Sequence, residues 1–295
     1  RRHQGHRSAG RGQVPRGQAV TRRPPKLEKL LEQTRGPRPV AFVLAGHNGS
    51  GKSTLWYSRL AASLQMPLIN ADRMMMSILP DADPQTGRIP VWAQQLRDDD
   101  EKWQVLSQEG VRAFKSLVMD QRMPFAFETV FSHWKPLPGG GHESKADDIR
   151  AMQAAGYFVV LLFVGLVSVD MSVFRVSTRK QRGGHDVEHQ KPTERFPGPQ
   201  AAVGHAAQIA NMTLMFDNSR SDENAFALAR VQTKKSILFD ARDPQFTVDP
   251  ELRAVGGLWL EKVAGPFKPR RAVRKEKKAA MPATHGSKTT PESTP

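Results

Sequence analysis

The stretch GHNGSGKST at residues 46–54 fits the pattern G-x-x-x-x-G-K-[ST] and directly follows the apolar run Val40–Ala45. Glycines in this pattern let successive backbone N–H groups curl around a phosphate with no Cβ in the way. Lys52 supplies a positive charge for the β- and γ-phosphates, and the Ser53 hydroxyl can enter the shell of a Mg²⁺ ion. A helix expected from Ser53 to about Leu64 would point its positive N-terminal end at the same anion. The sequence therefore predicts a loop that binds ATP or GTP.

Every residue of this loop is expected to contact the nucleotide: Gly46, His47, Asn48, Gly49, Ser50, Gly51, Lys52, Ser53 and Thr54. Ser53 is the one expected to contact the metal, because a hydroxyl oxygen is the kind of ligand that Mg²⁺ prefers. A chance Gly/Ser-rich turn is the alternative interpretation. The apolar run before the loop and the expected helix after it argue against that alternative.

The positive charge of the chain is concentrated at its two ends. Residues 1–39 contain eleven Lys/Arg and two Glu, and residues 262–295 contain nine Lys/Arg and two Glu, so the middle carries −1 of the total of +15. Both ends are rich in Gly, Pro, Ser, Thr and charge, and they cannot bury enough apolar surface to offset their ordering entropy. We expect disordered basic tails at 1–37 and 263–295, apart from a short helix at Leu27–Gln33.

Such tails can bind nucleic acid by releasing counterions, but aromatic residues do not alternate with these charges, so base stacking is not indicated. We favour solubilising extensions over nucleic-acid contact. The absence of cysteine excludes disulfides, thiolate catalysis and cysteine-based zinc sites. The longest apolar run, Tyr157–Val167, is too short to span a bilayer, and the sequence starts without an apolar signal region. We expect a cytoplasmic protein with no membrane span.

Residues 38–262 alternate short apolar runs with longer amphipathic ones, which is typical of βαβ units around a parallel sheet. The expected strands are Val40–Ala45, Pro67–Asn70, Pro124–Val130, Tyr157–Val164 and Thr213–Phe216, with Ile237–Asp240 as an extra strand near the edge. Helices are expected after the loop, around Met74–Leu79, and within Val91–Arg122, Ser144–Ala155, Ser168–Gln181 and Pro199–Ala210. We predict one α/β domain with a three-layer P-loop kinase fold, in which helices flank a mostly parallel sheet.

Two further patterns refine this prediction. In the long segment 91–122, an inner apolar face is expected from Trp92, Leu96, Trp103, Leu106, Phe114, Leu117 and Val118. Residues 134–142 contain two prolines and three consecutive glycines, so we expect a loop there, at the edge where open α/β sheets bind ligands.

Carboxylates follow two of the expected strands at this ligand edge. Asp72 comes directly after the second strand, and Glu128 lies at the end of the third with Thr129 beside it. Phosphoryl transfer to a hydroxyl needs one carboxylate to accept the hydroxyl proton and another group to orient the acceptor or Mg²⁺. The structural alternatives are a helix cap for Asp72 and a strand-end ion pair for Glu128.

A basic segment, Arg175–Arg182, precedes a Gly-Gly turn, and Arg195 follows it. The charge that spreads over a transferring phosphoryl group calls for guanidinium groups that arrive when the site closes. A lid carrying Arg179 and Arg195 would supply them. A solvated basic helix is the alternative from spacing alone, and we interpret His185 and His189 as loop residues rather than metal ligands.

The order of these motifs resembles the zeta-toxin family of P-loop kinases from bacterial toxin–antitoxin systems. The resemblance rests on AGHNGSGKST, INADRM, FAFETVFSH, AAGYFVVLLFVGLVS, RVSTRKQRGGHDV, RF and LMFDNS, and it covers about residues 38–220. The chain departs from the family pattern in two places: Pro192 stands where an apolar helix residue is common, and Gly198 and Pro199 follow the RF pair, where a second arginine is usual. Residues 134–143 resemble an insertion beside the substrate pocket.

The resemblance implies transfer of the γ-phosphate of ATP, with Mg²⁺, to a sugar hydroxyl of UDP-N-acetylglucosamine. It implies that Asp72 is the base, that Glu128 and Thr129 lie in the sugar-nucleotide pocket, and that Arg179 and Arg195 are lid arginines. Lys52 and Ser53 would hold phosphates and Mg²⁺. It also implies a separate small antitoxin protein as partner, since nothing in the sequence looks like a fused one.

Two alternatives stay open at this stage. The same fold could phosphorylate a nucleoside, a polynucleotide end or an antibiotic hydroxyl, because the family pattern specifies the phosphate chemistry better than the acceptor. Alternatively, the chain could be a nucleotide-binding switch without transfer activity, in which case replacing Asp72 would have no effect on its behaviour.

Overall fold

The computed structural model describes residues 21–131, 133–181 and 197–269, with the backbone alone at 176–181 and 197. Within this part of the chain the main sheet has seven strands in the order β2-β3-β1-β6-β7-β8-β9. The strands are β1 Val40–Ala45, β2 Leu68–Ile69, β3 Phe125–Thr129, β6 Phe158–Gly165, β7 Met212–Asp217, β8 Ala227–Thr233 and β9 Ile237–Asp240. The pairings from β2 to β7 are parallel, and those of β7 with β8 and β8 with β9 are antiparallel. The predicted mostly parallel sheet is confirmed.

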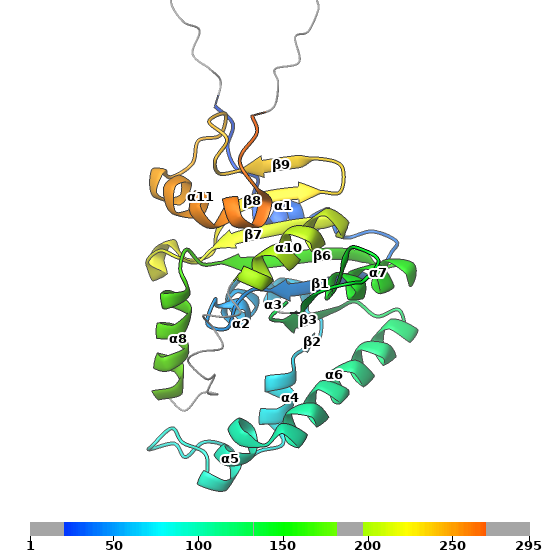
Figure 1. Ribbon diagram of the computed structural model, residues 1–295, viewed down its shortest axis with the longest axis vertical. Helices are drawn as coiled ribbons and strands as arrows, with labels where there is room; N and C mark the ends of the chain where they lie inside the picture. The colour runs from blue at the N-terminus through cyan, green and yellow to red at the C-terminus, as the bar shows by residue number, and fades with distance from the viewer. Residues whose placement is uncertain (1–20, 132, 182–196, 270–295) are drawn as a thin grey trace, which may run out of the picture.

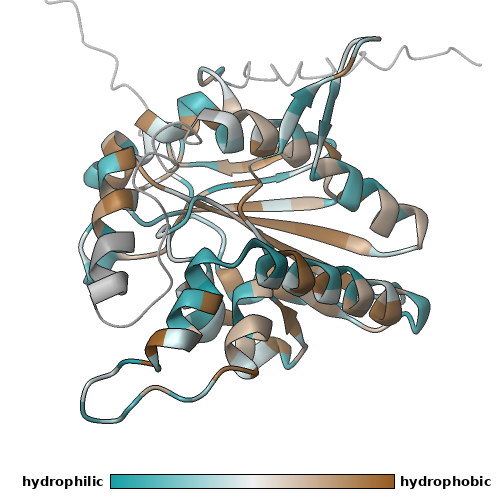
Figure 2. Ribbon diagram, turned by 60° about the horizontal axis from the view of Figure 1, so that its bottom comes forward, coloured by the Kyte–Doolittle hydropathy of each residue, from teal (hydrophilic) through white to brown (hydrophobic). Residues whose placement is uncertain are grey.

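The central strands β1 and β6 are buried on both faces, so almost all their residues are apolar. Register pairs Val43 of β1 with Phe127 of β3 on one side and with Leu161 of β6 on the other. Figure 2 shows these strands as a continuous apolar band inside a more polar shell of helices. This band fixes the strand ends that carry the site.

Helices form the two outer layers (Figure 1). Their bounds are α1 Leu27–Glu32, α2 Lys52–Leu55, α3 Ala61–Leu64, α7 Ala146–Ala154, α8 Val169–Gln181, α10 Pro197–Ile209 and α11 Pro250–Ala264, with a π-helical turn at Trp56–Leu60 between α2 and α3 and a 3₁₀ turn at Asp222–Asn224. After β1 the chain crosses to β2, at one edge of the sheet. The crossovers from β3 to β6 and from β6 to β7 run in the opposite direction, towards the other edge. Because such crossovers are right-handed, α2 and α3 lie on one face, while α7 and α10 lie on the opposite face with α11. No helix in the described part is long and apolar enough to cross a membrane.

Three helices between β2 and β3 form an arm that projects from the sheet: α4 Ala71–Ser77, α5 Val91–Asp99 and α6 Glu101–Asp120 (Figure 1). The predicted inner face of this segment is largely wrong. Trp92, Leu106, Phe114 and Leu117 are each at least half exposed, whereas Val118 is buried. The reason is that α6 packs mainly on α4 and meets the sheet near β2 and, through Lys115, at Phe127 of β3. In the described part of the chain, this leaves most of its apolar stripe uncovered.

The expected loop at 134–142 is also corrected. Trp134–Pro136 (β4) and His142–Ser144 (β5) pair as an antiparallel hairpin, with Gly140 and Gly141 at positive φ in its turn. Glycine adopts these angles without strain, which explains the glycines at positions 140 and 141. The Trp134 and His142 rings stack across the hairpin, with centroids 4.1 Å apart.

The N-terminal segment joins the fold earlier than residue 38. The predicted helix at Leu27–Gln33 is present as α1, and its Leu30 and Leu31 are buried in the main core. Arg22 pairs with Phe246 in a short parallel bridge. The expected C-terminal tail also begins too early, because Val263 and Ala264 complete α11 and Val263 is buried. Residues 1–20 and 270–295 of the two expected tails lie outside the described residues.

Two elements had no counterpart among the predictions. Strand β8 buries Arg230 and Gln232, and Arg230 pairs with Asp240 of β9, so polar residues interrupt its apolar pattern. Helix α11 begins at Pro250 and contains Gly256 and Gly257, which lower its helix propensity. It is held in place by Trp259, which is buried against Phe163 of β6.

Candidate functional site

The loop between β1 and α2 has the backbone that its glycines allow. Gly46, Gly49 and Gly51 all have positive φ, at 148°, 73° and 94°. A Cβ on Gly46 would lie 2.8 Å from the carbonyl oxygen of Val164, and one on Gly51 would lie 2.6 Å from Asn218 Nδ2. The pattern glycines are therefore required for conformation and for space, as predicted from the motif.

Two segments hold the loop from outside. Asn218, directly after β7, donates from Nδ2 to the carbonyl oxygen of Ser50 at 2.8 Å. Ser172 of α8 donates from Oγ to the carbonyl oxygen of Asn48 at 2.5 Å. Within the loop, the Ser50 N–H donates to the carbonyl oxygen of His47 at 3.1 Å. These bonds fix the loop before any ligand arrives, which is what phosphate recognition by backbone N–H groups needs.

Lys52 lies at the centre of the site and is 5% exposed. Its Nζ donates to the carbonyl oxygens of Gly46 at 3.0 Å and His47 at 2.9 Å, and it lies 3.7 Å from Glu128 Oε1. Burial, together with the charge of Lys52, lowers the pKa of His47 to about 3. His47 is therefore neutral at physiological pH, and Lys52 supplies the cation of the loop.

Glu128 connects the loop with the next strand. Its Oε2 accepts hydrogen bonds from Ser53 Oγ and from Asn70 Nδ2, each at 2.8 Å. Asn70 in turn caps α4, because its Oδ1 accepts the Arg73 N–H at 3.0 Å. The cap of α4 is thus Asn70, and the capping alternative for Asp72 is wrong: Asp72 lies in the first turn with an exposed side chain.

A cavity of about 230 Å³ brings the predicted catalytic and substrate residues together. Its wall includes Lys52, Asp72, Glu128 and Thr129. The other lining residues are Asn48, Asn70, Ala71, Gln108, Val111, Val130, His133 and Lys145. The P-loop, the α4–α6 arm and the flanks of the β4–β5 hairpin therefore meet at one point, at the carboxyl ends of β1, β2 and β3.

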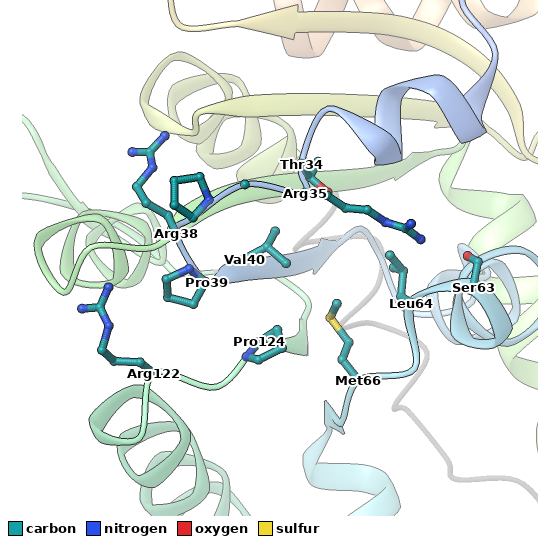
Figure 3. Close-up of a pocket in the computed structure, with 12 residues that line it drawn as sticks. Thr34, Arg35, Arg38, Pro39, Val40, Ser63, Leu64, Met66, Arg122 and Pro124 are labelled. Carbon is teal, nitrogen blue, oxygen red and sulfur yellow. The ribbon is translucent and has the colours of Figure 1, made fainter.

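A larger hollow of about 730 Å³ lies at the opposite ends of the same strands (Figure 3). Val40, the first residue of β1, and Pro124, directly before β3, lie in its floor. Arg35, Arg38 and Arg122 surround it. Among the described residues, its lining includes no residue of the P-loop and none from the carboxyl end of a strand. We therefore take the smaller cavity as the candidate site, although it has less volume, because it contains the P-loop lysine and the two carboxylates.

The family model for zeta toxin matches residues 26–223. The chain belongs to the zeta toxin family. The match starts within the N-terminal segment that packs on the core, in agreement with the buried leucines of α1. As a zeta toxin family member the chain is a kinase, and it carries out ATP-dependent phosphoryl transfer.

Solved structures with a similar fold include a chain of the AvrRxo1-ORF1:-ORF2 complex with ATP. It has a TM-score of 0.50 and 16% identity, covering 81% of this chain and 84% of that one. A chain of the PezAT chromosomal toxin–antitoxin system of Streptococcus pneumoniae has a TM-score of 0.44 and 13% identity, covering 82% and 86%. A search of curated proteins found no match.

The two lid arginines cannot be placed in the same way. Arg179 lies in α8, which leaves β6 beside the P-loop, and its side chain is among those not described. Arg195, with His185 and His189, lies outside the described residues. Helix α10 starts at Pro197, so Gly198 and Pro199 are accommodated in its first turn, where proline fits.

Several residues of the site were not singled out by sequence reasoning. Asn70 lies between β2 and α4 and Gln108 lies in α6, and neither gave a signal beyond its polarity. His133 and Lys145 flank the hairpin, and its pairing brings them to the same cavity. Arg175 lies one turn after Ser172 on α8, and its Nη1 is buried with no hydrogen-bond partner among the described residues. In the sequence, only its position at the start of the basic segment Arg175–Arg182 could have marked it as a site residue.

Proposed function

We propose that this kinase transfers the γ-phosphate of ATP to a hydroxyl of UDP-N-acetylglucosamine. The observation that carries the proposal is the single cavity in which Lys52 of the P-loop faces the same space as Asp72 and Glu128. Hydroxyl phosphorylation requires at least a group that holds the phosphates of the donor and a group that accepts the proton, both in one cavity. The choice of the sugar nucleotide rests on the family resemblance and is the part that the acceptor experiment below tests.

In this proposal the loop residues 46–54 bind the ATP phosphates through backbone N–H groups, and Lys52 turns from its carbonyl partners to the β- and γ-oxygens. The acceptor oxygen attacks the γ-phosphorus, the bond to the β,γ-bridging oxygen breaks, and ADP leaves. The hydroxyl proton passes to the carboxylate of Asp72. Exposure of Asp72 on the cavity wall leaves it accessible to an incoming hydroxyl.

The residues around Ser53 fit a Mg²⁺ ion. The Ser53 hydroxyl and the Glu128 carboxylate lie 2.8 Å apart, and both offer the oxygen ligands that Mg²⁺ prefers. When bound, the ion would neutralise charge on the β- and γ-phosphates. Glu128 would then orient Ser53, and its contact with Asn70 would keep the carboxylate directed at the loop. This adds a role to the substrate-pocket position that the resemblance implies.

Arginines on the α8 side complete the proposed site. We assign Arg179 and Arg195 to the lid that stabilises charge on the transferring phosphoryl group. Arg175 is added to them, since its buried Nη1 has no hydrogen-bond partner among the described residues and α8 contacts the P-loop through Ser172. A phosphate oxygen would satisfy that donor.

The acceptor side fits the end of a sugar. The cavity is smaller than most ligand sites, so it would hold the reacting ring while the rest of the acceptor lies outside. Glu128, Thr129 and Gln108 provide hydrogen-bonding groups for ring hydroxyls, and His133 and Lys145 stand at the hairpin side. A separate antitoxin-type protein is also proposed as partner, because the solved complex with ATP contains two different proteins.

Transfer of label from γ-labelled ATP with Mg²⁺ tests the acceptor directly. Parallel reactions would contain UDP-N-acetylglucosamine, free N-acetylglucosamine, UDP, or no acceptor, each with and without a chelator. Label that appears on UDP-N-acetylglucosamine alone, and disappears with the chelator, is the expected result. ATP that binds while every sugar stays unlabelled would contradict the acceptor, and nucleosides, oligonucleotide ends and antibiotics would then be offered in turn.

A further inference from the structure

The segment that follows β7 runs beside the P-loop. Asn218 donates to the carbonyl oxygen of Ser50, and the Val167 N–H donates to Ser219 Oγ at 2.9 Å. The segment then makes the 3₁₀ turn Asp222–Asn224 and enters β8 at Ala227. In Figure 1 this turn, α2 and the start of α8 lie at the same edge of the sheet.

Phe226 is a second residue of this segment that contacts the loop. Its Cε1 and Cζ atoms lie 3.1 and 3.2 Å from the point that a Cβ on Gly51 would occupy. Gly51 thus leaves room for an aromatic ring against the first turn of α2. The ring packs against the core and is also partly exposed, so part of its surface is accessible to a ligand.

The backbone of Phe226 is unusual as well. Its φ is +57°, in the left-handed region that bulky residues rarely adopt. Glycine or asparagine would make the same turn without strain, and the neighbouring Asn224 shows that such residues occur in this segment. Residues with a strained backbone of this kind cluster at ligand sites, so the strain at Phe226 points to a task for its ring.

We propose that Phe226 forms the platform on which the base of the bound nucleotide stacks. The acceptor cavity does not include Phe226 among its lining residues, so the ring is not part of the wall that carries Asp72. A nucleotide whose phosphates occupy residues 46–54 must extend its ribose and base away from the acceptor. An aromatic ring is suited to stacking with any base, since every base has a π-face. This inference rests on the proposed use of ATP.

The test separates the base from the phosphates. Binding of ATP and of inorganic tripolyphosphate, both with Mg²⁺, would be measured for the full chain, for Phe226→Ala and for Phe226→Leu. Phe114→Ala is the matched control, because Phe114 is an exposed phenylalanine on α6, away from the loop. Phe226→Leu keeps most of the volume against Gly51 but lacks the aromatic face, so it remains informative if the alanine variant fails to fold.

We expect both Phe226 variants to lose about tenfold or more in ATP affinity and to bind tripolyphosphate as the wild type does. Equal losses for the two ligands would show that Phe226 only supports Gly51 and would overturn the platform. Unchanged ATP affinity in Phe226→Leu would overturn it too. A wild-type chain that binds neither ligand would instead contradict the proposed function.

Discussion

The two halves of the site are built differently. On the nucleotide side, Ser50 and Lys52 are buried, and the loop is bonded to segments that follow β6 and β7. On the acceptor side, Asp72 is exposed on a short helix, and the arm that carries it leaves much of its apolar surface uncovered. The difference shows that the phosphate half is fixed by the sheet, whereas the acceptor half depends on elements that pack on each other.

This contrast has a functional consequence. Backbone N–H groups in a preformed loop stabilise phosphates without reorganisation, so their geometry tolerates little change. Side chains on the arm and hairpin can be exchanged without disturbing the sheet, so the acceptor half can be adapted to different hydroxyl compounds. Substitutions in one half should therefore leave the other half unaffected.

The largest effect is expected from the loop lysine. Lys52→Ala removes the cation that we propose faces the phosphates, and we expect the transfer rate to fall by about a thousandfold or more. Lys102→Ala, which changes an exposed lysine on the arm, is the matched control and should retain wild-type turnover. Steady-state kinetics with saturating acceptor would measure both. A Lys52→Ala enzyme within tenfold of wild type would mean that the loop is not the phosphate site.

The buried loop histidine gives the nucleotide half a pH-dependent stability. The pKa of His47 is about 3 in the folded chain, against an ordinary value of 6.5, so only the unfolded state takes up this proton between those values. The contribution is therefore complete above pH 6.5 and is lost as the pH falls towards 3. Between pH 7.5 and 5 this costs about 2 kcal/mol of unfolding free energy.

His47→Asn should lack this component. Denaturant unfolding without nucleotide at pH 7.5 and at pH 5 would show a smaller drop for the variant than for the wild type, by about that amount. Identical drops in the two proteins would mean that His47 is accessible to protons, and the nucleotide half would then be less closed than its burial indicates.

A paired substitution separates the halves directly. Asn218→Ala removes a bond to the loop, and Gln108→Ala removes a polar group from the acceptor wall. The loss with Asn218→Ala should be about tenfold, the usual scale for one buried hydrogen bond, and that with the exposed Gln108 should be a few-fold. It should appear in the KM for ATP with Asn218→Ala and in the KM for the acceptor with Gln108→Ala. If both variants change both constants alike, the division into two halves is wrong.

The smallest effect is expected at the hairpin. Trp134→Ala removes the stack on His142 and the edge contact with His205 of α10, which together are worth about 1 kcal/mol. The flanking His133 and Lys145 would lose their fixed position, so we expect the acceptor KM to rise a few-fold with the ATP KM unchanged. A change confined to the ATP KM would place the hairpin with the nucleotide half.

The same contrast explains what sequence could predict. The loop, its flanking strand and helix, and the carboxylates after the second and third strands are local patterns, and the structure brings Lys52, Asp72 and Glu128 to one cavity. Which residues line its far wall depends on the hairpin pairing, which a run of three glycines and two prolines conceals. The exposed side chains of α6 were predicted to be inside because helical periodicity reports an apolar face but not whether anything covers it.

The role of Asp72 is the central claim, and a single-turnover comparison of wild type with Asp72→Asn tests it most directly. ATP affinity should be unchanged, because Asp72 lies in α4 and not in the loop, while the transfer rate should fall by about a hundredfold or more. Asp81→Asn, an exposed carboxylate in the loop after α4, should behave as wild type. An Asp72→Asn enzyme that still transfers phosphate at the wild-type rate would show that Asp72 is not the base.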